Sequence, residues 1–233
     1  MNESERSSKL MARLRYEFNN RSLLSEALTH RSAAPINNER LEFLGDSILN
    51  FVIANELYHM YPDSPEGDLS RLRASLVKKE GLALIAKDLD LGEYLILGSG
   101  ELKSGGFRRD SILADTVEAI LGAVYLDGGF EASSDLILRL YQQQLENIPD
   151  VSQLKDPKTR LQELLQARKI ALPSYQVVDV SGKAHQQTFV ISCGIDELSV
   201  NTQGKAGSRR KAEQLAAEKA IVEVENLFSK AKQ

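Results

Sequence analysis

The chain has 233 residues, of which 42% are hydrophobic and 27% charged, with a net charge of −4, one cysteine and no tryptophan. This length allows one large domain or two of modest size. We find no apolar run that would serve as a signal peptide or a transmembrane helix, so we expect a cytoplasmic protein without membrane association. The single Cys193 excludes an internal disulfide framework, and we expect it at a buried strand position.

The average charge hides two opposite halves of the chain. Residues 1–150 carry 16 Lys and Arg against 24 Asp and Glu, a net charge of −8, whereas residues 151–233 carry 13 against 9, a net charge of +4. A basic module is what binding to a nucleic acid requires. We therefore expect one domain over 1–150 and a second over 156–233, joined by a linker at 151–155.

The first part of the chain predicts two short helices. Residues 10–18 are amphipathic, and residues 21–32 begin a second helix with Ser22 as its expected cap. His30, near the end of this segment, could bind a metal, but hydrogen bonding is the favoured interpretation. Pro35 and two asparagines predict a loop over residues 33–38.

An acidic stripe marks the next predicted helix, which begins with Asn38-Glu39-Arg40-Leu41-Glu42-Phe43-Leu44-Gly45-Asp46-Ser47 and continues to Leu57. At about 100° per residue, Glu39, Glu42 and Asp46 fall within roughly 60° of one another. The neighbouring stripe is apolar and comprises Leu41, Leu44, Ile48, Phe51 and Val52. Like charges at this spacing repel unless a cation lies between them, and carboxylate oxygens suit Mg²⁺ or Mn²⁺. A solvated helix face is the alternative.

Residues 61–68 interrupt the helical pattern, which resumes at 69–77. Glu66 lies in this break, where an acid is favoured near a helix amino terminus, so that a structural and a functional role are equally open. A further short helix is expected at 82–88, and residues 98–106 are expected to form a loop.

The segment 111–126 is almost entirely apolar and predicts a helix that is buried nearly all round. Asp115 and Glu118 lie three residues apart within it. Ionised carboxylates are rarely buried without partners or a metal, so these two acids favour a functional site. Another helix over 127–146 closes the first domain.

The remaining residues predict the order α-β-β-β-α. A helix begins at Asp156-Pro157, β-rich runs cover 174–181, 187–193 and 197–203, and a last helix covers 208–227. This order resembles a double-stranded RNA-binding domain. The last helix starts beside four cations without an intervening acid, which favours phosphate binding there: Lys205, Arg209, Arg210 and Lys211.

Several segments together resemble the bacterial ribonuclease III family over nearly the whole chain. They are residues 27–32, the decapeptide 38–47, Glu66-Gly67-Asp68, residues 101–109, residues 113–119 and the second domain. The resemblance implies an all-α nuclease domain followed by a small α+β double-stranded RNA-binding domain. It also implies a homodimer that hydrolyses duplex RNA with Mg²⁺, for which Mn²⁺ should substitute. The products would be staggered ends with 5′-phosphate and 3′-hydroxyl groups, and the substrates ribosomal RNA precursors and structured messenger RNA.

The same resemblance assigns roles to individual residues. The expected metal ligands are Glu42, Asp46, Asp115 and Glu118, and Asp46 and Glu118 are also the expected catalytic residues. Glu39 and Glu66 are expected near the site without a defined role, and Phe43 is expected at the dimer contact. The expected RNA-binding residues are Gln162, Glu163, His185, Arg209, Arg210 and Lys211. The alternative is a catalytically silent duplex-RNA-binding or assembly protein, which would have no reason to keep Asp115 and Glu118.

Overall fold

The computed structural model describes residues 3–148, 155–183 and 186–230. The chain divides into two compact units, Met1–Pro149 and Asp150–Gln233. Of the expected linker at 151–155, residues 151–154 lie outside the described part. In the described ranges, no helix is both long and apolar enough to cross a membrane.

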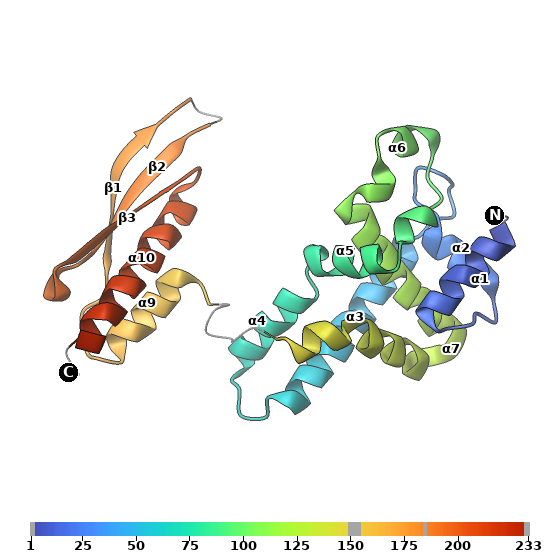
Figure 1. Cartoon of the computed structure of the whole chain (residues 1–233), viewed down its shortest axis with the longest axis horizontal. Coiled ribbons are helices and arrows are strands. Elements are labelled where there is room, and N and C mark those ends of the chain that lie inside the picture. Colours follow the sequence, from blue (N-terminus) through green and yellow to red (C-terminus); the bar gives the residue numbers. More distant parts are fainter. Residues whose placement is uncertain (1–2, 149–154, 184–185, 231–233) are drawn as a thin grey trace. The chain divides into compact units, whose positions relative to one another are not determined.

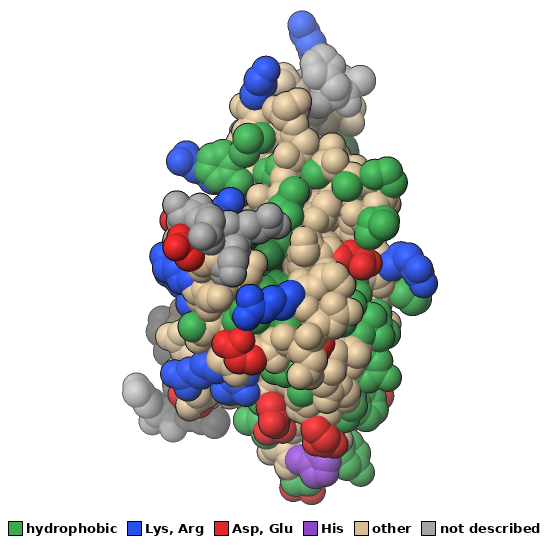
Figure 2. Space-filling view, turned by 90° about the vertical axis from the view of Figure 1, so that its right-hand side faces the viewer, with side chains coloured by type: hydrophobic (Ala, Val, Ile, Leu, Met, Phe, Trp, Pro, Cys, Tyr) green, Lys and Arg blue, Asp and Glu red, His purple; other side chains and the backbone are tan. Residues whose placement is uncertain are grey.

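The first unit is built of helices (Figure 1). They are α1 (Glu3–Leu14), α2 (Arg21–Leu28), α3 (Glu39–Met60), α4 (Glu66–Leu76), α5 (Lys79–Asp88), α6 (Ser99–Lys103) and α7 (Asp110–Glu146), with short 3₁₀ turns at Leu91–Glu93 and Gly106–Arg108. On the face drawn in Figure 2, acidic, basic and hydrophobic side chains are interspersed.

Helices α3 and α7 form the centre of this unit and approach each other unusually closely. The contact depends on two glycines, because a Cβ at Gly45 would overlap the carbonyl oxygen of Glu118 and a Cβ at Gly122 would overlap that of Leu41. Backbone therefore packs on backbone at the level of the acidic residues. The pairing brings the acidic stripe of α3 beside the acids of α7.

Helix α7 confirms the expected buried segment and the helix that follows it. Most side chains from Ile112 to Val124 are buried. Gly129 interrupts the helix with φ 83° and ψ −175°, a backbone conformation that glycine adopts readily and that L-residues avoid. The second part of α7 buries Leu136, Ile137 and Tyr141.

Several details of the first unit differ from the sequence-based expectations. Helix α1 spans Glu3–Leu14 rather than 10–18 and is followed by Arg15 at φ 50°, a left-handed conformation that ends a helix. Helix α2 is capped by Asn20, whose side-chain oxygen accepts a hydrogen bond from the backbone N–H of Ser22 at 3.1 Å, so Ser22 is not the cap. Helix α2 ends at Leu28 and does not continue to residue 32 as expected.

Further differences concern the start of α4, residues 98–106 and Phe51. Helix α4 begins at Glu66, inside the interruption expected over 61–68. Residues 98–106 contain helix α6 and the start of a 3₁₀ turn instead of a plain loop. Phe51, expected on the buried stripe, is 59% exposed and makes an edge-to-face contact with Phe130, with 5.7 Å between the ring centres. It lies at the margin of the stripe, where the helix surface turns to solvent.

The second unit confirms the α-β-β-β-α order. It comprises α9 (Pro157–Gln166), β1 (Ser174–Ser181), β2 (Thr188–Ile195), β3 (Val200–Ala206) and α10 (Arg209–Lys230). The strands form an antiparallel sheet in the order β1-β2-β3. Strands β2 and β3 extend further along the chain than expected, because Asp196–Leu198 form a 3₁₀ turn and Ser199, at φ 53°, completes the reversal.

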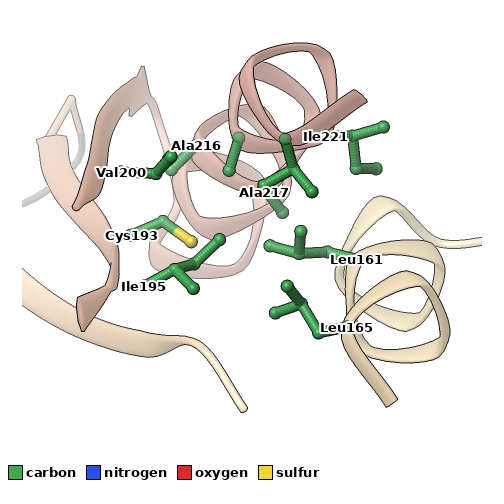
Figure 3. Close-up of a cluster of buried hydrophobic side chains, with 10 residues drawn as sticks. Leu161, Leu165, Cys193, Ile195, Val200, Ala216, Ala217 and Ile221 are labelled. Carbon is green, nitrogen blue, oxygen red and sulfur yellow. The ribbon is translucent and has the colours of Figure 1, made fainter. Parts of the chain in front are cut away.

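The core of this unit lies between the sheet and its two helices. Figure 3 shows Leu161 and Leu165 from α9 pointing toward side chains of β2, β3 and α10. Cys193 is buried among them on β2, which confirms the structural interpretation of the only cysteine in the chain. Charged residues of α9 and α10, such as Glu163 and Arg210, are exposed to solvent.

Candidate active site

Three carboxylates from two helices converge in the first unit. Glu42 lies on α3, and Asp115 and Glu118 lie on α7; ligand oxygens of all three fall within 4.8 Å of one another. All three residues are half-buried. Helix α3 supplies Glu42 from its first turn, and the contact through Gly45 sets its distance from Glu118. Oxygen donors at this spacing suit a hard divalent cation.

Asp46 lies one turn after Glu42 and is exposed. Its Oδ1 accepts a hydrogen bond from the Asn50 amide at 2.9 Å. Its charge nevertheless raises the pKa values of both Glu118 and Glu42. Asp46 therefore belongs electrostatically to the cluster, although it is not one of the three residues whose oxygens converge.

The carboxylates of the cluster repel one another. Burial, followed by the charges of Asp46, Glu42 and Asp115, raises the pKa of Glu118 to about 8. Burial and then the charge of Asp115 also raise the pKa of Glu42. Repulsion among half-buried carboxylates is relieved by protonation or by a bound cation, so the residues present fit a divalent metal.

One cation already lies at the cluster. The ammonium of Lys79, the first residue of α5, is 3.2 Å from Oδ1 of Asp115. Lys79 was not expected at the site, because nothing in the spacing of a lysine at the start of α5 predicts contact with an acid on α7.

A polar cavity of about 430 Å³ adjoins Glu42 and Asp115. Its lining includes residues from three of the segments that resemble the ribonuclease III family. They are His30 and Ser32 from 27–32, Glu39 from 38–47, and Glu101 and Arg109 from 101–109. Glu39 pairs with Arg31 at 3.2 Å, and Glu101 pairs with Arg109 at 2.9 Å. Glu39 thus lines the same cavity as Glu42 and Asp115.

His30 has a structural role in this arrangement. Its Nδ1 accepts the backbone N–H of Ser32 at 3.2 Å and lies 2.8 Å from the Ser32 hydroxyl, which therefore donates to it. The same hydroxyl oxygen accepts the N–H of Gly98 at 3.0 Å. These contacts agree with the hydrogen-bonding interpretation of His30.

Two other expected residues lie outside the cluster. Glu66 is the first residue of α4, where it accepts a hydrogen bond from the Ser70 hydroxyl at 2.7 Å. Phe43 is 77% exposed. Phe43 lines an open cavity of about 570 Å³ together with residues that include Leu23, Leu41, Leu44 and Leu126.

In the second unit, the expected cations gather where α10 begins. Arg209 donates from Nε to Glu213 at 3.0 Å, and Lys158 of α9 donates to the other oxygen of Glu213 at 2.6 Å. These two bonds lower the pKa of Glu213, with the Lys158 bond contributing most. Arg210 is highly exposed, and its nearest acid is Asp156 at 3.9 Å.

On α9, Gln162 and Glu163 are exposed. Glu163 accepts a hydrogen bond from Lys155 at 2.8 Å. The α9 residues and the cationic start of α10 are thus both accessible for binding. His185 lies outside the described residues.

A carboxylate cluster in a helical unit and a separate α-β-β-β-α unit with a cationic helix start are features expected of a metal-dependent nuclease with its own duplex-RNA-binding module. Comparison with known families agrees with this class. Residues 20–145 match the family model described as Ribonuclease-III-like, and residues 157–223 match the double-stranded RNA binding motif.

Individual relatives extend over most of the chain. Ribonuclease 3 of Alkalilimnicola ehrlichii is 59% identical over 217 residues, which cover 93% of this chain and 95% of that protein. Ribonuclease 3 of Shewanella denitrificans is 61% identical over 211 residues, covering 90% and 93%. The solved nuclease domain of ribonuclease III from Campylobacter jejuni is 45% identical and covers 59% of this chain and 97% of its own, with a TM-score of 0.58. The chain therefore belongs to the ribonuclease III family.

Proposed function

We propose that this protein hydrolyses phosphodiester bonds of double-stranded RNA with Mg²⁺ held by Glu42, Asp46, Asp115 and Glu118. The observation that carries the proposal is the convergence of three half-buried carboxylates from α3 and α7 within 4.8 Å. Family membership as an endoribonuclease of duplex RNA supports it. Mn²⁺ should replace Mg²⁺, because both accept carboxylate oxygen ligands.

The chemistry divides among the residues of the cluster. A bound Mg²⁺ would supply a water of lowered pKa and neutralise charge on the phosphate. Glu42 and Asp115 would hold the ion. Glu118, whose pKa is raised to about 8 by burial and its acidic neighbours, would bind the ion and orient the attacking water. Asp46 would also hold the ion and would support Glu118 from the exposed side of the cluster.

The second unit would hold the duplex. By this proposal, Arg209, Arg210 and Lys211 contact phosphates, while Gln162, Glu163 and His185 contact 2′-hydroxyls and base edges in the minor groove. Such contacts recognise the shape of A-form RNA rather than its sequence. Support comes from Glu213, which orients Arg209 at the start of α10 and Lys158 at the start of α9.

A homodimer is part of the proposal. Phe43 is exposed beside a leucine-lined concavity on the same surface, so two copies related by a twofold axis could each insert Phe43 into the other. The Campylobacter jejuni nuclease domain is described as having a flexible region involved in dimer formation. Two sites in one dimer would cut the two strands at a stagger and leave 5′-phosphate and 3′-hydroxyl ends. Ribosomal precursors and structured messenger RNA in the cytoplasm are the proposed substrates.

The test is cleavage of an end-labelled RNA duplex in Mg²⁺, in Mn²⁺ and in chelator, with single-stranded RNA and duplex DNA of the same sequence as controls. We expect the metals to give staggered cuts in duplex RNA alone, and phosphatase sensitivity to locate the phosphate at the 5′ end. Cleavage that continues in chelator, or that is equal on single strands, would contradict the proposal.

A further inference from the structure

Lys79 is placed as a counter-ion of the proposed metal site. Its Nζ lies 3.2 Å from Oδ1 of Asp115, and within the described ranges it is the one cation paired with a member of the trio Glu42, Asp115 and Glu118. The side chain of Lys79 is 65% exposed, whereas that of Asp115 is 28% exposed. The ammonium therefore approaches the cluster from solvent at the end of a flexible stem.

We propose that Lys79 occupies Asp115 in the metal-free protein and competes with the divalent ion for this carboxylate. The inference rests on the proposed metal site. An ammonium and a divalent cation repel each other strongly at a separation of a few ångströms. Binding of both cations to Asp115 at the same time is therefore unfavourable. Because Lys79 is largely exposed, its ammonium returns to water easily when it leaves.

This arrangement has two opposite effects on the protein. Lys79 stabilises the metal-free fold, because it offsets repulsion among carboxylates that are held together by the α3–α7 contact. For the same reason it lowers the affinity for the metal, since its favourable contact with Asp115 must be given up. The site would then bind its ion reversibly rather than retain it.

A purely structural role would have different consequences. Helix α5 already packs on α7 through buried side chains that include Leu82, Ile85 and Ala86. A second ion pair, between Lys87 of α5 and Asp110 of α7 at 2.7 Å, joins the same two helices. If Lys79 served only to fasten α5, its removal would affect stability as the removal of Lys87 does, and the metal affinity would not follow the charge at position 79.

The test is titration of Mn²⁺ into the full-length protein without RNA, with free Mn²⁺ followed by electron paramagnetic resonance. The variants are Lys79→Arg, Lys79→Met and Lys79→Glu, with Lys87→Met as the matched control. We expect Lys79→Met to bind about three- to tenfold more tightly than wild type, Lys79→Glu more tightly still, and Lys79→Arg within about twofold of wild type. The control Lys87→Met should match wild type in Mn²⁺ affinity. In thermal unfolding with chelator, Lys79→Met should be less stable than wild type, and Lys79→Glu less stable still.

The outcomes separate this inference from the function on which it rests. Equal Mn²⁺ affinity in all Lys79 variants, beside a wild type that binds Mn²⁺, would overturn the role of Lys79 and leave the proposed metal site intact. Loss of affinity in Lys79→Met would also overturn it. Absence of Mn²⁺ binding in wild type and variants alike would overturn both the inference and the metal site.

Discussion

Glu118 has a strongly raised pKa and is also a proposed catalytic residue. It is half-buried on α7, among carboxylates from both central helices, and its pKa is raised from 4.5 to about 8. A carboxyl with a raised pKa in the folded state binds its proton more tightly when folded than when unfolded. In the absence of metal, Glu118 therefore favours folding at low pH and loses this contribution as the pH rises from about 4.5 to about 8.

The first prediction concerns Glu118→Gln in chelator. At pH 5 its melting temperature should be close to that of wild type, because glutamine resembles the protonated acid. At pH 8 the variant should be more stable, by about 2–4 °C for each kcal/mol of relieved repulsion. Thermal unfolding from pH 5 to 8 measures this difference. Glu131→Gln, an exposed position on the same helix, is the control, and parallel curves for wild type and Glu118→Gln would refute the electrostatic account.

The second prediction concerns Arg210, whose side chain is 84% exposed at the start of α10. A phosphate contact contributes without regard to sequence and releases about one counterion. Arg210→Ala should therefore weaken binding of all RNA duplexes alike and reduce the salt slope by about 1. Binding at several salt concentrations measures the slope. Lys219→Ala, on the same helix but bonded to the Gln203 carbonyl, should keep the wild-type slope, and an unchanged slope in Arg210→Ala would remove Arg210 from the interface.

At the scale of elements, the site depends on how closely α3 and α7 approach. Glu42 and Asp46 come from one helix and Asp115 and Glu118 from the other, so the cluster exists only while the backbones stay in contact. Gly45 permits that contact, because any side chain there would overlap the Glu118 carbonyl. The glycine in the middle of the acidic decapeptide thus has a packing role that is as specific as the role of the acids.

The third prediction is that Gly45→Ala disrupts the site. Inserting a methyl group into a packed interface costs about 1–3 kcal/mol, and here the obstacle is backbone rather than a movable side chain. Both the melting temperature and Mn²⁺ binding should fall. Gly100→Ala on α6, where the new Cβ would meet nothing within 4 Å, is the control and should leave both unchanged. Wild-type metal binding in Gly45→Ala would show that the close approach is not required.

The elements also show what the sequence can and cannot predict. The long helices, the buried segment of α7 and the α-β-β-β-α order follow from periodicity and were expected correctly. Helix α6 was missed because glycine and serine weaken its pattern, and Asn20 was missed because two polar residues compete for one cap position. Periodicity within one helix places Glu42 beside Asp46, but it does not reveal which partner helix they face.

The carboxylate cluster was expected from the resemblance as well as from the acids themselves. The placement of Lys79 against Asp115 could not be expected in this way, because it depends on tertiary structure between α5 and α7. Contacts of this kind have no periodic signal in the sequence.

At the scale of the whole molecule, charge is divided between the two units. Residues 1–150 carry a net charge of −8 and residues 151–233 a net charge of +4. An acidic unit that binds a metal repels the phosphates of its own substrate when the metal is absent. In the proposed function, the basic unit would offset this repulsion by binding phosphates of the duplex.

The fourth prediction is that removing residues 151–233 makes cleavage sensitive to salt. The truncated protein should cleave duplex RNA at low ionic strength and fail at physiological ionic strength, because it lacks the phosphate contacts of the basic unit. Initial rates over a salt series, for the truncated and the full-length protein, provide the measurement. Equal salt tolerance of the two proteins would contradict the proposed division of labour.

The most direct test of the central claim compares wild type with Glu118→Gln on one end-labelled RNA duplex, measuring cleavage in Mg²⁺ and binding in Ca²⁺ on the same preparations. We predict staggered cuts by wild type, loss of cleavage in Glu118→Gln, and equal duplex binding by both, because the substitution leaves the second unit untouched. Binding without cleavage by wild type would contradict the account and support a catalytically silent duplex-RNA-binding protein.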